Sequence, residues 1–325
     1  MRGLVIKSTG TSYMVHFEDG TTVDCHVKGN FRIRGIRSTN PVAIGDYVEV
    51  KTENGSSKSE SAELTHWISE VYDRKNYIVR RATNLSFASH ILAANVDMAA
   101  LIVTVRHPET STTFIDRFLA TCEAYRVPAC LIFNKIDLLN EDEQQELLAL
   151  RQLYESIGYP TYAISALNDA AMVNNQLSSL FHGKVTLLSG NSGVGKSTLL
   201  NAILGEDVAR TGAISTAHHK GMHTTTFSEM YPVESLGDKT EISNSWIIDT
   251  PGIKGFGILD MQKEEIGHYF REIFRISREC KYSDCIHMNE PGCAVNQAVI
   301  DGRIALSRYE SYLSMLDDTC EGKYR

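Results

Sequence analysis

The sequence predicts an α/β domain with a mostly parallel sheet, preceded by an all-β barrel and followed by a helical metal-binding module. In the first 72 residues, five short runs alternate apolar and polar positions between turn residues, which is typical of a small antiparallel barrel. From residue 96 onward, strand-like and helix-like segments alternate, which favours a parallel sheet covered by helices. Near the C-terminus, three cysteines and a histidine lie within 14 residues.

The composition is that of a globular chain. Its 325 residues suit two or three domains, and 42% of them are hydrophobic. No uncharged apolar run reaches the roughly 18 residues of a transmembrane helix, so we expect no membrane contact. The apolar start at residues 3–6 ends too early for a signal peptide. Seven cysteines, an odd number, argue against a full set of disulfides, and we expect a monomer in the reducing cytoplasm.

The pattern divides the chain into four parts: an OB-type barrel at 1–72, a polar linker at 73–95, the α/β domain at 96–258 and the helical module at 259–325. Barrel strands are expected at 4–6, 13–17, 22–27, 47–50 and 64–71, with a surface loop at 52–61. Later strands are expected at 96–105, 129–133, 161–164, 185–189 and 246–249. Helices are expected at 114–122, 141–157, 264–276 and 297–316. Two more are expected, one that ends at residue 181 and one that begins at residue 196.

A glycine-rich loop directly after the strand at 185–189 fits the phosphate-loop pattern G-x-x-x-x-G-K-S. The residues assigned to nucleotide binding here are Gly190, Asn191, Ser192, Gly193, Val194, Gly195, Lys196, Ser197 and Thr198. Lys196 is predicted to contact the β- and γ-phosphates and act in catalysis, and Ser197 to bind Mg²⁺. The alternative is a glycine loop before an ordinary helix with an exposed lysine. The strand before the loop and the helix after it favour the phosphate loop.

A second nucleotide motif, Asn134-Lys135-Ile136-Asp137, lies earlier in the chain. The Asp137 carboxylate can accept both N–H donors on the edge of guanine, which adenine lacks, and the stem of Lys135 can pack on the base. Ser165-Ala166, after the next strand, resembles the loop whose backbone N–H contacts the guanine oxygen. The alternative for Asn134 to Asp137 is a turn that caps a helix.

The order of the two motifs reverses that of an ordinary GTPase, in which the phosphate loop comes first. The order is that of a domain whose ends have been joined and whose chain has been reopened elsewhere. We therefore predict a circularly permuted P-loop GTPase domain that converts GTP to GDP and phosphate. Asp249-Thr250-Pro251-Gly252 fits D-x-x-G, in which Asp249 is expected to hold Mg²⁺ and the Gly252 N–H to reach the γ-phosphate.

A polar segment rich in Gly and Thr, 212–226, is the expected switch loop. Thr224 or Thr225 is predicted to complete the magnesium coordination, and Thr225 is also a catalytic candidate. The alternative is a solvated loop with incidental threonines.

Cys280, Cys285, His287 and Cys293 are spaced C-x4-C-x-H-x5-C. Three thiolates and one imidazole make the closed shell typical of a structural Zn²⁺ site. The ion would stabilise a helical module that is too short to hold its own core. The alternatives are buried free cysteines beside an unrelated histidine, or a redox pair.

Four basic residues of the barrel are candidate contacts with RNA: Lys28, Arg32, Arg34 and Arg37. Alternation in Phe31-Arg32-Ile33-Arg34 would make one face of a strand cationic toward phosphates. The net charge of −8 argues against a nucleic-acid partner, but the first 95 residues carry 12 Lys/Arg against 10 Asp/Glu. The alternative is a solvated basic edge that discourages aggregation.

Together these motifs resemble the ribosome small-subunit-dependent GTPase A family of circularly permuted GTPases, over nearly the whole chain. The resemblance also rests on Arg32-Ile33-Arg34-Gly35, Ala94-Asn95-Val96-Asp97 and Glu290-Pro291-Gly292-Cys293. It implies late-stage maturation of the small ribosomal subunit, contact with its rRNA, and hydrolysis stimulated by that subunit. Met222 departs from the arginine that the family usually has before the histidine.

Two other classes of protein compete with this interpretation. One is a P-loop kinase of a small molecule, which the guanine selectivity of Asp137 opposes. The other is an RNA-binding scaffold with a decayed nucleotide site, which the intact Lys196, Ser197 and Asp249 oppose.

The group that positions the attacking water gives the first testable prediction. The residue after Gly252 is the apolar Ile253, whereas many GTPases place a glutamine nearby. Our candidate is His223, because an imidazole of near-neutral pKa can orient or polarise water. We expect slow basal turnover that a partner accelerates. In His223→Ala, stimulated hydrolysis should fall while GTP affinity stays nearly intact; unchanged stimulated turnover would refute the assignment.

Overall fold

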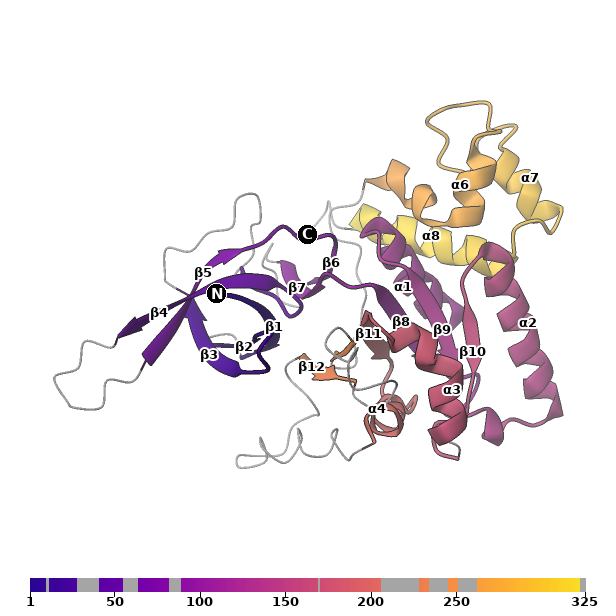
Figure 1. Cartoon of the computed structure of the whole chain (residues 1–325). Helices are drawn as coiled ribbons and strands as arrows, with labels where there is room; N and C mark the ends of the chain where they lie inside the picture. The colour runs from indigo at the N-terminus through magenta and orange to yellow at the C-terminus, as the bar shows by residue number, and fades with distance from the viewer. Residues whose placement is uncertain are drawn as a thin grey trace.

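The computed structural model describes residues 1–9, 12–27, 41–54, 64–81, 89–168, 170–205, 228–233, 245–250 and 262–321. Figure 1 shows a barrel, a sheet flanked by helices and a helical module, in this order along the chain. The predicted succession of all-β, α/β and helical parts is confirmed. Within the described ranges, no helix is both long and apolar enough to cross a membrane.

Five strands form the barrel because their alternate side chains meet in one apolar core. They are β1 (Arg2–Ser8), β2 (Tyr13–His16), β3 (Thr22–Val27), β4 (Tyr47–Asn54) and β5 (Leu64–Val71). The order is β1-β2-β3-β5-β4, and β4 pairs back onto β1 to close the barrel. Val5, Val15 and Cys25 are fully buried in its core. Of the surface loop predicted at 52–61, residues 52–54 belong instead to β4, and the rest lies outside the described residues.

The segment predicted as a polar linker contains a small sheet of its own. β6 (Tyr77–Arg81) and β7 (Ser89–Ala94) pair antiparallel. The buried Ile78 and Ala93 belong to the main apolar cluster of the next domain. The polar residues around the segment hid this pattern in the sequence.

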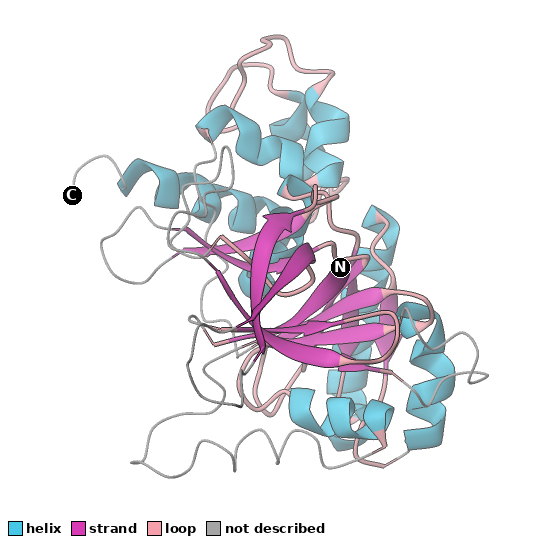
Figure 2. Cartoon of the chain, turned by 60° about the vertical axis from the view of Figure 1, so that its left-hand side comes forward, coloured by secondary structure: helices cyan, strands magenta, loops and turns pink. Residues whose placement is uncertain are grey.

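The central sheet has the order β10-β9-β8-β11-β13-β12, and every neighbouring pair except β13–β12 is parallel. Figure 2 shows the strands with helices packed beside them. The strands are β8 (Met98–Val103), β9 (Ala129–Phe133), β10 (Thr161–Ala163), β11 (Val185–Gly190), β12 (Glu229–Pro232) and β13 (Trp246–Asp249). The predicted strands are present. Strand β12 was not predicted from the sequence, because its four residues show only a short alternation of burial.

Four helices cover the two faces of this sheet. They are α1 (Thr112–Ala124), α2 (Glu141–Ile157), α3 (Ala170–Phe181) and α4 (Lys196–Leu204), with a short 3-10 helix, η1 (Ile136–Leu138), after β9. Residues of α1 and α2, such as Phe118 and Tyr154, join one apolar cluster. Residues of α3 and α4, such as Leu177 and Leu199, join the cluster on the other face. The sheet is therefore buried on both sides, as its continuous apolar strands require.

The barrel and the central sheet form one continuous eleven-stranded sheet. The link is the antiparallel pairing of β12 with β1, in which Lys7 lies opposite Glu229. The two side chains also form an ion pair with an N–O distance of 2.9 Å.

The C-terminal module contains η3 (Lys263–Tyr269), α6 (Arg271–Ser277), α7 (Ala294–Ile300) and α8 (Leu306–Glu321). Each of the two predicted helical stretches is broken in two. The first breaks at Phe270, whose extended backbone ends the 3-10 helix, and the second breaks at a turn in which Gly302 has a φ of 71°. These breaks let the short helices pack around one core that includes Phe270 and Tyr312.

A buried ion cluster joins this module to the central domain. Arg308 of α8 is 1% exposed and donates to Asp116 of α1 and Glu272 of α6, each at 2.6 Å. Tyr154 of α2 also donates to Asp116, at 2.9 Å. Burial raises the pKa of Asp116, and the adjacent guanidinium opposes that rise. Separating such buried partners is costly, so the module is held firmly against α1.

Candidate nucleotide and metal sites

The two nucleotide motifs meet at one edge of the sheet. Strand β8 lies between β9 and β11 and is parallel to both, so the loops after β9 and β11 leave the same edge. The Asn134 side chain donates from Nδ2 to the Val194 carbonyl at 2.9 Å. Lys135 Nζ donates to the Gly193 carbonyl at 2.6 Å. The structure thus brings together the predicted base-reading loop and the predicted phosphate loop.

Asn134 also holds the third predicted loop. Its Oδ1 accepts the Ala166 N–H at 3.0 Å, and the Ser165 hydroxyl donates to the Asp137 carboxylate at 2.6 Å. Asn134 is 4% exposed, so its amide joins the loops after β9, β10 and β11 from inside the protein. The Ala166 N–H, expected to face the guanine oxygen, is bonded to Asn134 in this structure.

The phosphate-loop glycines are required by close approach. A Cβ on Gly190 would lie 2.7 Å from the Ile102 carbonyl oxygen. A Cβ on Gly195 would lie 2.4 Å from Asn134 Nδ2, and Gly195 also has a left-handed φ of 91°. The two glycines therefore let the phosphate loop lie against its neighbours, in addition to shaping its turn.

At the other end of the loop, Lys196 lies beside the D-x-x-G aspartate. The ammonium of Lys196, the first residue of α4, pairs with the carboxylate of Asp249, the last residue of β13. Burial raises the pKa of Asp249, and Lys196 opposes that rise. The following Thr250, which the sequence analysis did not single out, is fully buried and donates its hydroxyl to the Leu188 carbonyl at 3.0 Å. This bond ties the start of the D-x-x-G segment to the phosphate-loop strand.

The remaining predicted nucleotide contacts divide into two groups. Ser192, Ser197 and Thr198 are exposed and Asn191 is half-buried on or beside the phosphate loop. His223, Thr224, Thr225 and Gly252 lie outside the described residues, as do Lys28, Arg32, Arg34 and Arg37.

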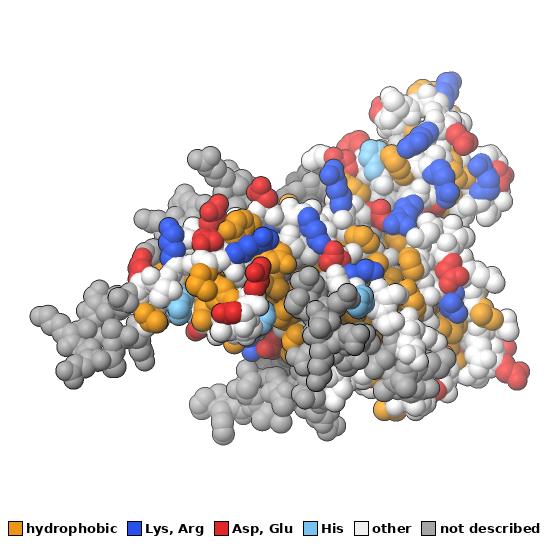
Figure 3. Space-filling view, viewed as in Figure 1, with side chains coloured by type: hydrophobic (Ala, Val, Ile, Leu, Met, Phe, Trp, Pro, Cys, Tyr) orange, Lys and Arg blue, Asp and Glu red, His pale blue; other side chains and the backbone are white. Residues whose placement is uncertain are grey.

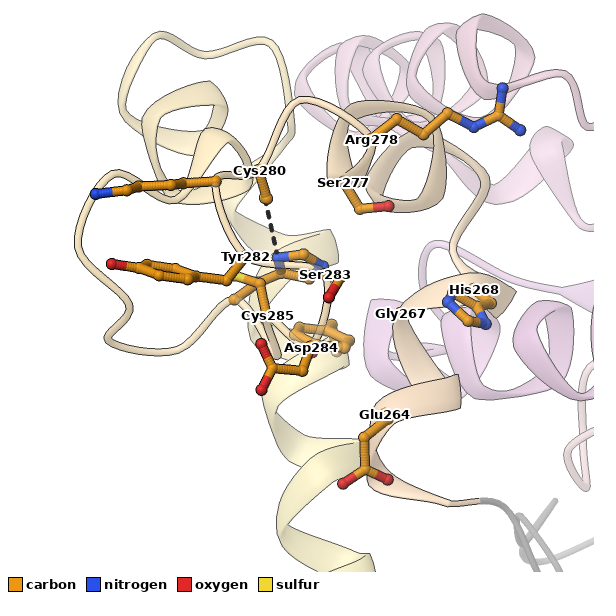
Figure 4. A pocket seen from close by; sticks show the side chains of 13 residues that line it. Glu264, Gly267, His268, Ser277, Arg278, Cys280, Tyr282, Ser283, Asp284 and Cys285 are labelled. Carbon is orange, nitrogen blue, oxygen red and sulfur yellow. Dashed lines mark hydrogen bonds between the residues drawn. The ribbon is translucent and has the colours of Figure 1, made fainter.

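The four predicted zinc ligands come together between α6 and α7. Figure 4 labels two of them, Cys280 and Cys285, in the pocket that borders the cluster. Their ligand atoms all lie within 4.8 Å of one another. His287 Nδ1 lies 3.6 Å from Cys280 Sγ and 3.5 Å from Cys293 Sγ, and these two sulfurs are 3.9 Å apart. A tetrahedral ion with metal–sulfur bonds of about 2.3 Å has ligand atoms about 3.8 Å apart. The donor set and its spacing therefore fit Zn²⁺.

Neighbouring side chains fix the loop that carries these ligands. The Tyr309 hydroxyl donates to the His287 carbonyl, and the Tyr312 hydroxyl to the Ile286 carbonyl, each at 2.6 Å. His287 itself has a left-handed φ of 58°. Glu290 accepts the N–H groups of residues 286, 288 and 289. A cavity of about 420 Å³ borders the cluster.

The shared edge, with a base-reading loop before a phosphate loop and an aspartate beside the loop lysine, defines a P-loop GTPase of permuted order. Comparison with known proteins agrees. The RsgA N-terminal domain matches residues 2–57, and the RsgA GTPase domain matches residues 71–259. The chain therefore belongs to the RsgA GTPase family.

Similar proteins match along the whole chain. A small ribosomal subunit biogenesis GTPase RsgA of Phocaeicola vulgatus is 60% identical over all 325 residues and 99% of its own length. One of Porphyromonas gingivalis is 51% identical with the same coverage.

Two solved structures have the same fold. YloQ, described as a circularly permuted GTPase, is 26% identical with a TM-score of 0.70, covering 100% of this chain and 96% of its own. YjeQ from Thermotoga maritima is 32% identical with a TM-score of 0.70, covering 98% and 97%. The predicted circular permutation is confirmed.

The contact between Gly195 and Asn134 can be tested with a matched pair of variants. Gly195→Ala adds a Cβ that would push Asn134 away and separate the two loops. We expect GDP affinity to fall by about tenfold or more, or about 1.4 kcal/mol. Gly205→Ala imposes a similar left-handed strain at a φ of 74° but meets nothing within 4 Å, so it should keep its affinity. Equal GDP affinities of the two variants, measured by calorimetry, would show that this contact does not maintain the pocket.

Proposed function

We propose that this GTPase acts late in the assembly of the small ribosomal subunit in the cytoplasm, and that the subunit stimulates its hydrolysis of GTP. The observation that carries the proposal is similarity over the full length to relatives named for small ribosomal subunit biogenesis. The presence of Lys196 and Asp249, which pair with each other at the phosphate loop, supports a working nucleotide site over a decayed one.

The proposed binding of the base uses the edge described above. Asp137 accepts the two guanine N–H donors, and the aliphatic stem of Lys135 lies along the base. The bonds from Lys135 Nζ to the carbonyls of His107 and Gly193, each 2.6 Å, hold that stem in place. Guanine selectivity follows from these contacts and opposes a kinase that uses ATP.

The proposed chemistry at the phosphates starts from the Lys196–Asp249 pair. In this structure the two charges neutralise each other in a largely buried place, since their side chains are 13% and 12% exposed. When nucleotide binds, Lys196 turns to the β- and γ-phosphates, and Asp249 together with Ser197 offers oxygen ligands of the kind that Mg²⁺ prefers. An Mg²⁺ ion held by Asp249 and Ser197 would neutralise charge that develops on the phosphates. Lys196 would thus exchange Asp249 for the phosphates, and Asp249 would exchange Lys196 for Mg²⁺, so neither charge would be left unpaired.

The switch-loop roles remain proposals. His223 positions the attacking water, Thr224 or Thr225 completes the magnesium coordination, and the Gly252 N–H contacts the γ-phosphate.

The proposed contacts with rRNA are Lys28, Arg32, Arg34 and Arg37. On the face in Figure 3, basic and acidic side chains are interspersed over the barrel and the helical module. A face with charges of both signs favours contacts through particular basic residues over attraction by a uniformly positive surface. If these four residues form only a solvated edge, replacing them with neutral residues should leave the affinity for RNA unchanged.

The most direct test is GTP turnover with and without purified small subunits, at graded salt. We expect stimulation by subunits that weakens as salt rises, because phosphate contacts release counterions. Lys196→Ala should lose both basal and stimulated turnover. ATP in excess should not compete with GTP; competition by ATP would favour the kinase, and binding of RNA without any turnover would favour the scaffold.

We further propose one structural Zn²⁺ ion on Cys280, Cys285, His287 and Cys293, a set whose donor chemistry and spacing fit this ion. Cys293→Ser should lower the zinc content from about one ion per chain and reduce the melting temperature, because metal binding contributes to folding. Basal hydrolysis of GTP should persist, since the predicted nucleotide-binding loops lie at the edge of the central sheet and not in this module. Cys25→Ala, in the barrel core, should keep its zinc. A full zinc content in Cys293→Ser would exclude this ligand set.

A further inference from the structure

The segment Ala94-Asn95-Val96-Asp97, which the nucleotide site does not use, lies where three parts of the protein meet. It runs from the last residue of β7 to the residue before β8 and lies beside the start of the phosphate-loop strand β11. Asn95 is 9% exposed and has a left-handed φ of 57°. A buried amide in that backbone conformation is held by contacts on more than one side.

On the barrel side, the segment holds the loop before β4. Asn95 Nδ2 donates to the Gly45 carbonyl at 2.9 Å, and the Ala94 N–H donates to the Ile44 carbonyl at 2.8 Å. Gly45 has a φ of 85°, and a Cβ there would lie 2.2 Å from the Ala94 carbonyl oxygen. The barrel therefore approaches this segment as closely as a glycine allows.

The linker also holds this loop, through Arg74. Asp46 is fully buried and accepts from Arg74 Nε and Nη2, each at 2.6 Å, and from the Ala43 N–H at 2.7 Å. A bidentate, buried pair of this kind has a defined geometry. The Gly45 carbonyl is thus presented to Asn95 by a rigid loop.

The linker is held on the other side of the Asn95 side-chain amide. Asn95 Oδ1 accepts the Lys75 N–H at 2.9 Å. Asn76 exchanges two bonds of 2.8 Å with the Val96 backbone, one as donor and one as acceptor. The Asn95 side chain thus accepts a hydrogen bond from the linker through its carbonyl oxygen and donates one to the barrel through its amino group.

Asp97 continues the chain of contacts to the phosphate-loop strand. Its Oδ2 accepts the Val185 N–H at 2.9 Å, and its own N–H donates to the Val185 carbonyl at 2.8 Å. Lys75 pairs with the other carboxylate oxygen. Val185 is the first residue of β11, whose last residue, Gly190, begins the phosphate loop.

We propose that Asn95 and Asp97 are positioning residues that hold the barrel at a fixed orientation to the phosphate loop, so that a partner bound by the barrel meets the nucleotide at a defined place. The pairing of β1 with β12 gives the second point of attachment, and two separate attachments oppose rotation about either one. This inference rests on the proposed function, because it assigns the joint a role in stimulation by the small subunit.

The test uses the full-length chain and two variants that loosen the joint from opposite sides. Asn95→Asp keeps the oxygen that accepts from Lys75 and loses the N–H that donates to Gly45. Gly45→Ala places a Cβ against the Ala94 carbonyl. The first matched control is Asn140→Asp, at a helix N-cap where Asp serves equally well. The second is Gly205→Ala, which also places an alanine in a left-handed backbone conformation but meets no atom within 4 Å.

Four quantities are measured for each protein: GDP affinity, basal single-turnover hydrolysis, the turnover rate at saturating small subunits, and the subunit concentration for half-maximal stimulation. We expect the saturated rate to fall about tenfold or more in both joint variants, because misplacement of a catalytic arrangement is costly even at full occupancy. Basal hydrolysis and GDP affinity should stay within about twofold of the parent. Both controls should behave as the parent.

Two results would overturn the inference alone. If the parent responds to subunits and the joint variants reach the same saturated rate, the joint does not position the partner. If basal hydrolysis falls in parallel with stimulated hydrolysis, the contact between Asn95 and Gly45 supports the phosphate loop and does not only orient the barrel. A parent chain that does not respond to subunits would instead overturn the proposed function, and this inference with it.

Discussion

The nucleotide edge depends on one buried amide, that of Asn134. It donates to the phosphate loop at Val194 and accepts from the third loop at Ala166, so three loops that follow different strands keep a common geometry. Losing the amide would leave a buried carbonyl and a buried N–H without partners, each costing about 1–3 kcal/mol. The pocket therefore needs the adjacency of β9, β8 and β11, which does not depend on the order in which the strands are synthesised. That independence explains in physical terms how a permuted chain can build the same site.

Local signals made the elements around this edge predictable. The helix predicted at 141–157 has those bounds in the structure, because Asn140 caps its start and Gly158 ends it in a left-handed conformation. The members of the Cys/His cluster could be named from spacing alone, since all four lie on one short stretch of chain. The elements that were missed depend on distant partners. β12 is stabilised by pairing with β13 and β1, and the strands of the linker by packing under the main apolar cluster, neither of which leaves a strong local pattern.

The same distinction applies to individual site residues. Lys196 and Asp137 belong to motifs whose spacing predicts nucleotide binding, and the structure places both motifs at the same edge of the central sheet. Asn95 stands in a short segment whose type and spacing suggest no chemistry, and only its contacts with Gly45 and Lys75 reveal what it joins. Its left-handed backbone is equally invisible in sequence, although Asn is one of the few residue types that adopt it readily.

The attachment of the helical module limits how the nucleotide can influence it. Arg308 bridges Asp116 and Glu272 within the interior, and Arg271 adds a bond of 2.8 Å to Glu123 at the other end of α1. Withdrawing Arg308 would leave two buried carboxylates without their counter-charge, a loss of about 3–5 kcal/mol. Rearrangements at the phosphates that move the module against α1 would have to exceed this amount. The module is therefore better regarded as part of the rigid frame, held along α1 by Arg308 at Asp116 and by Arg271 at Glu123.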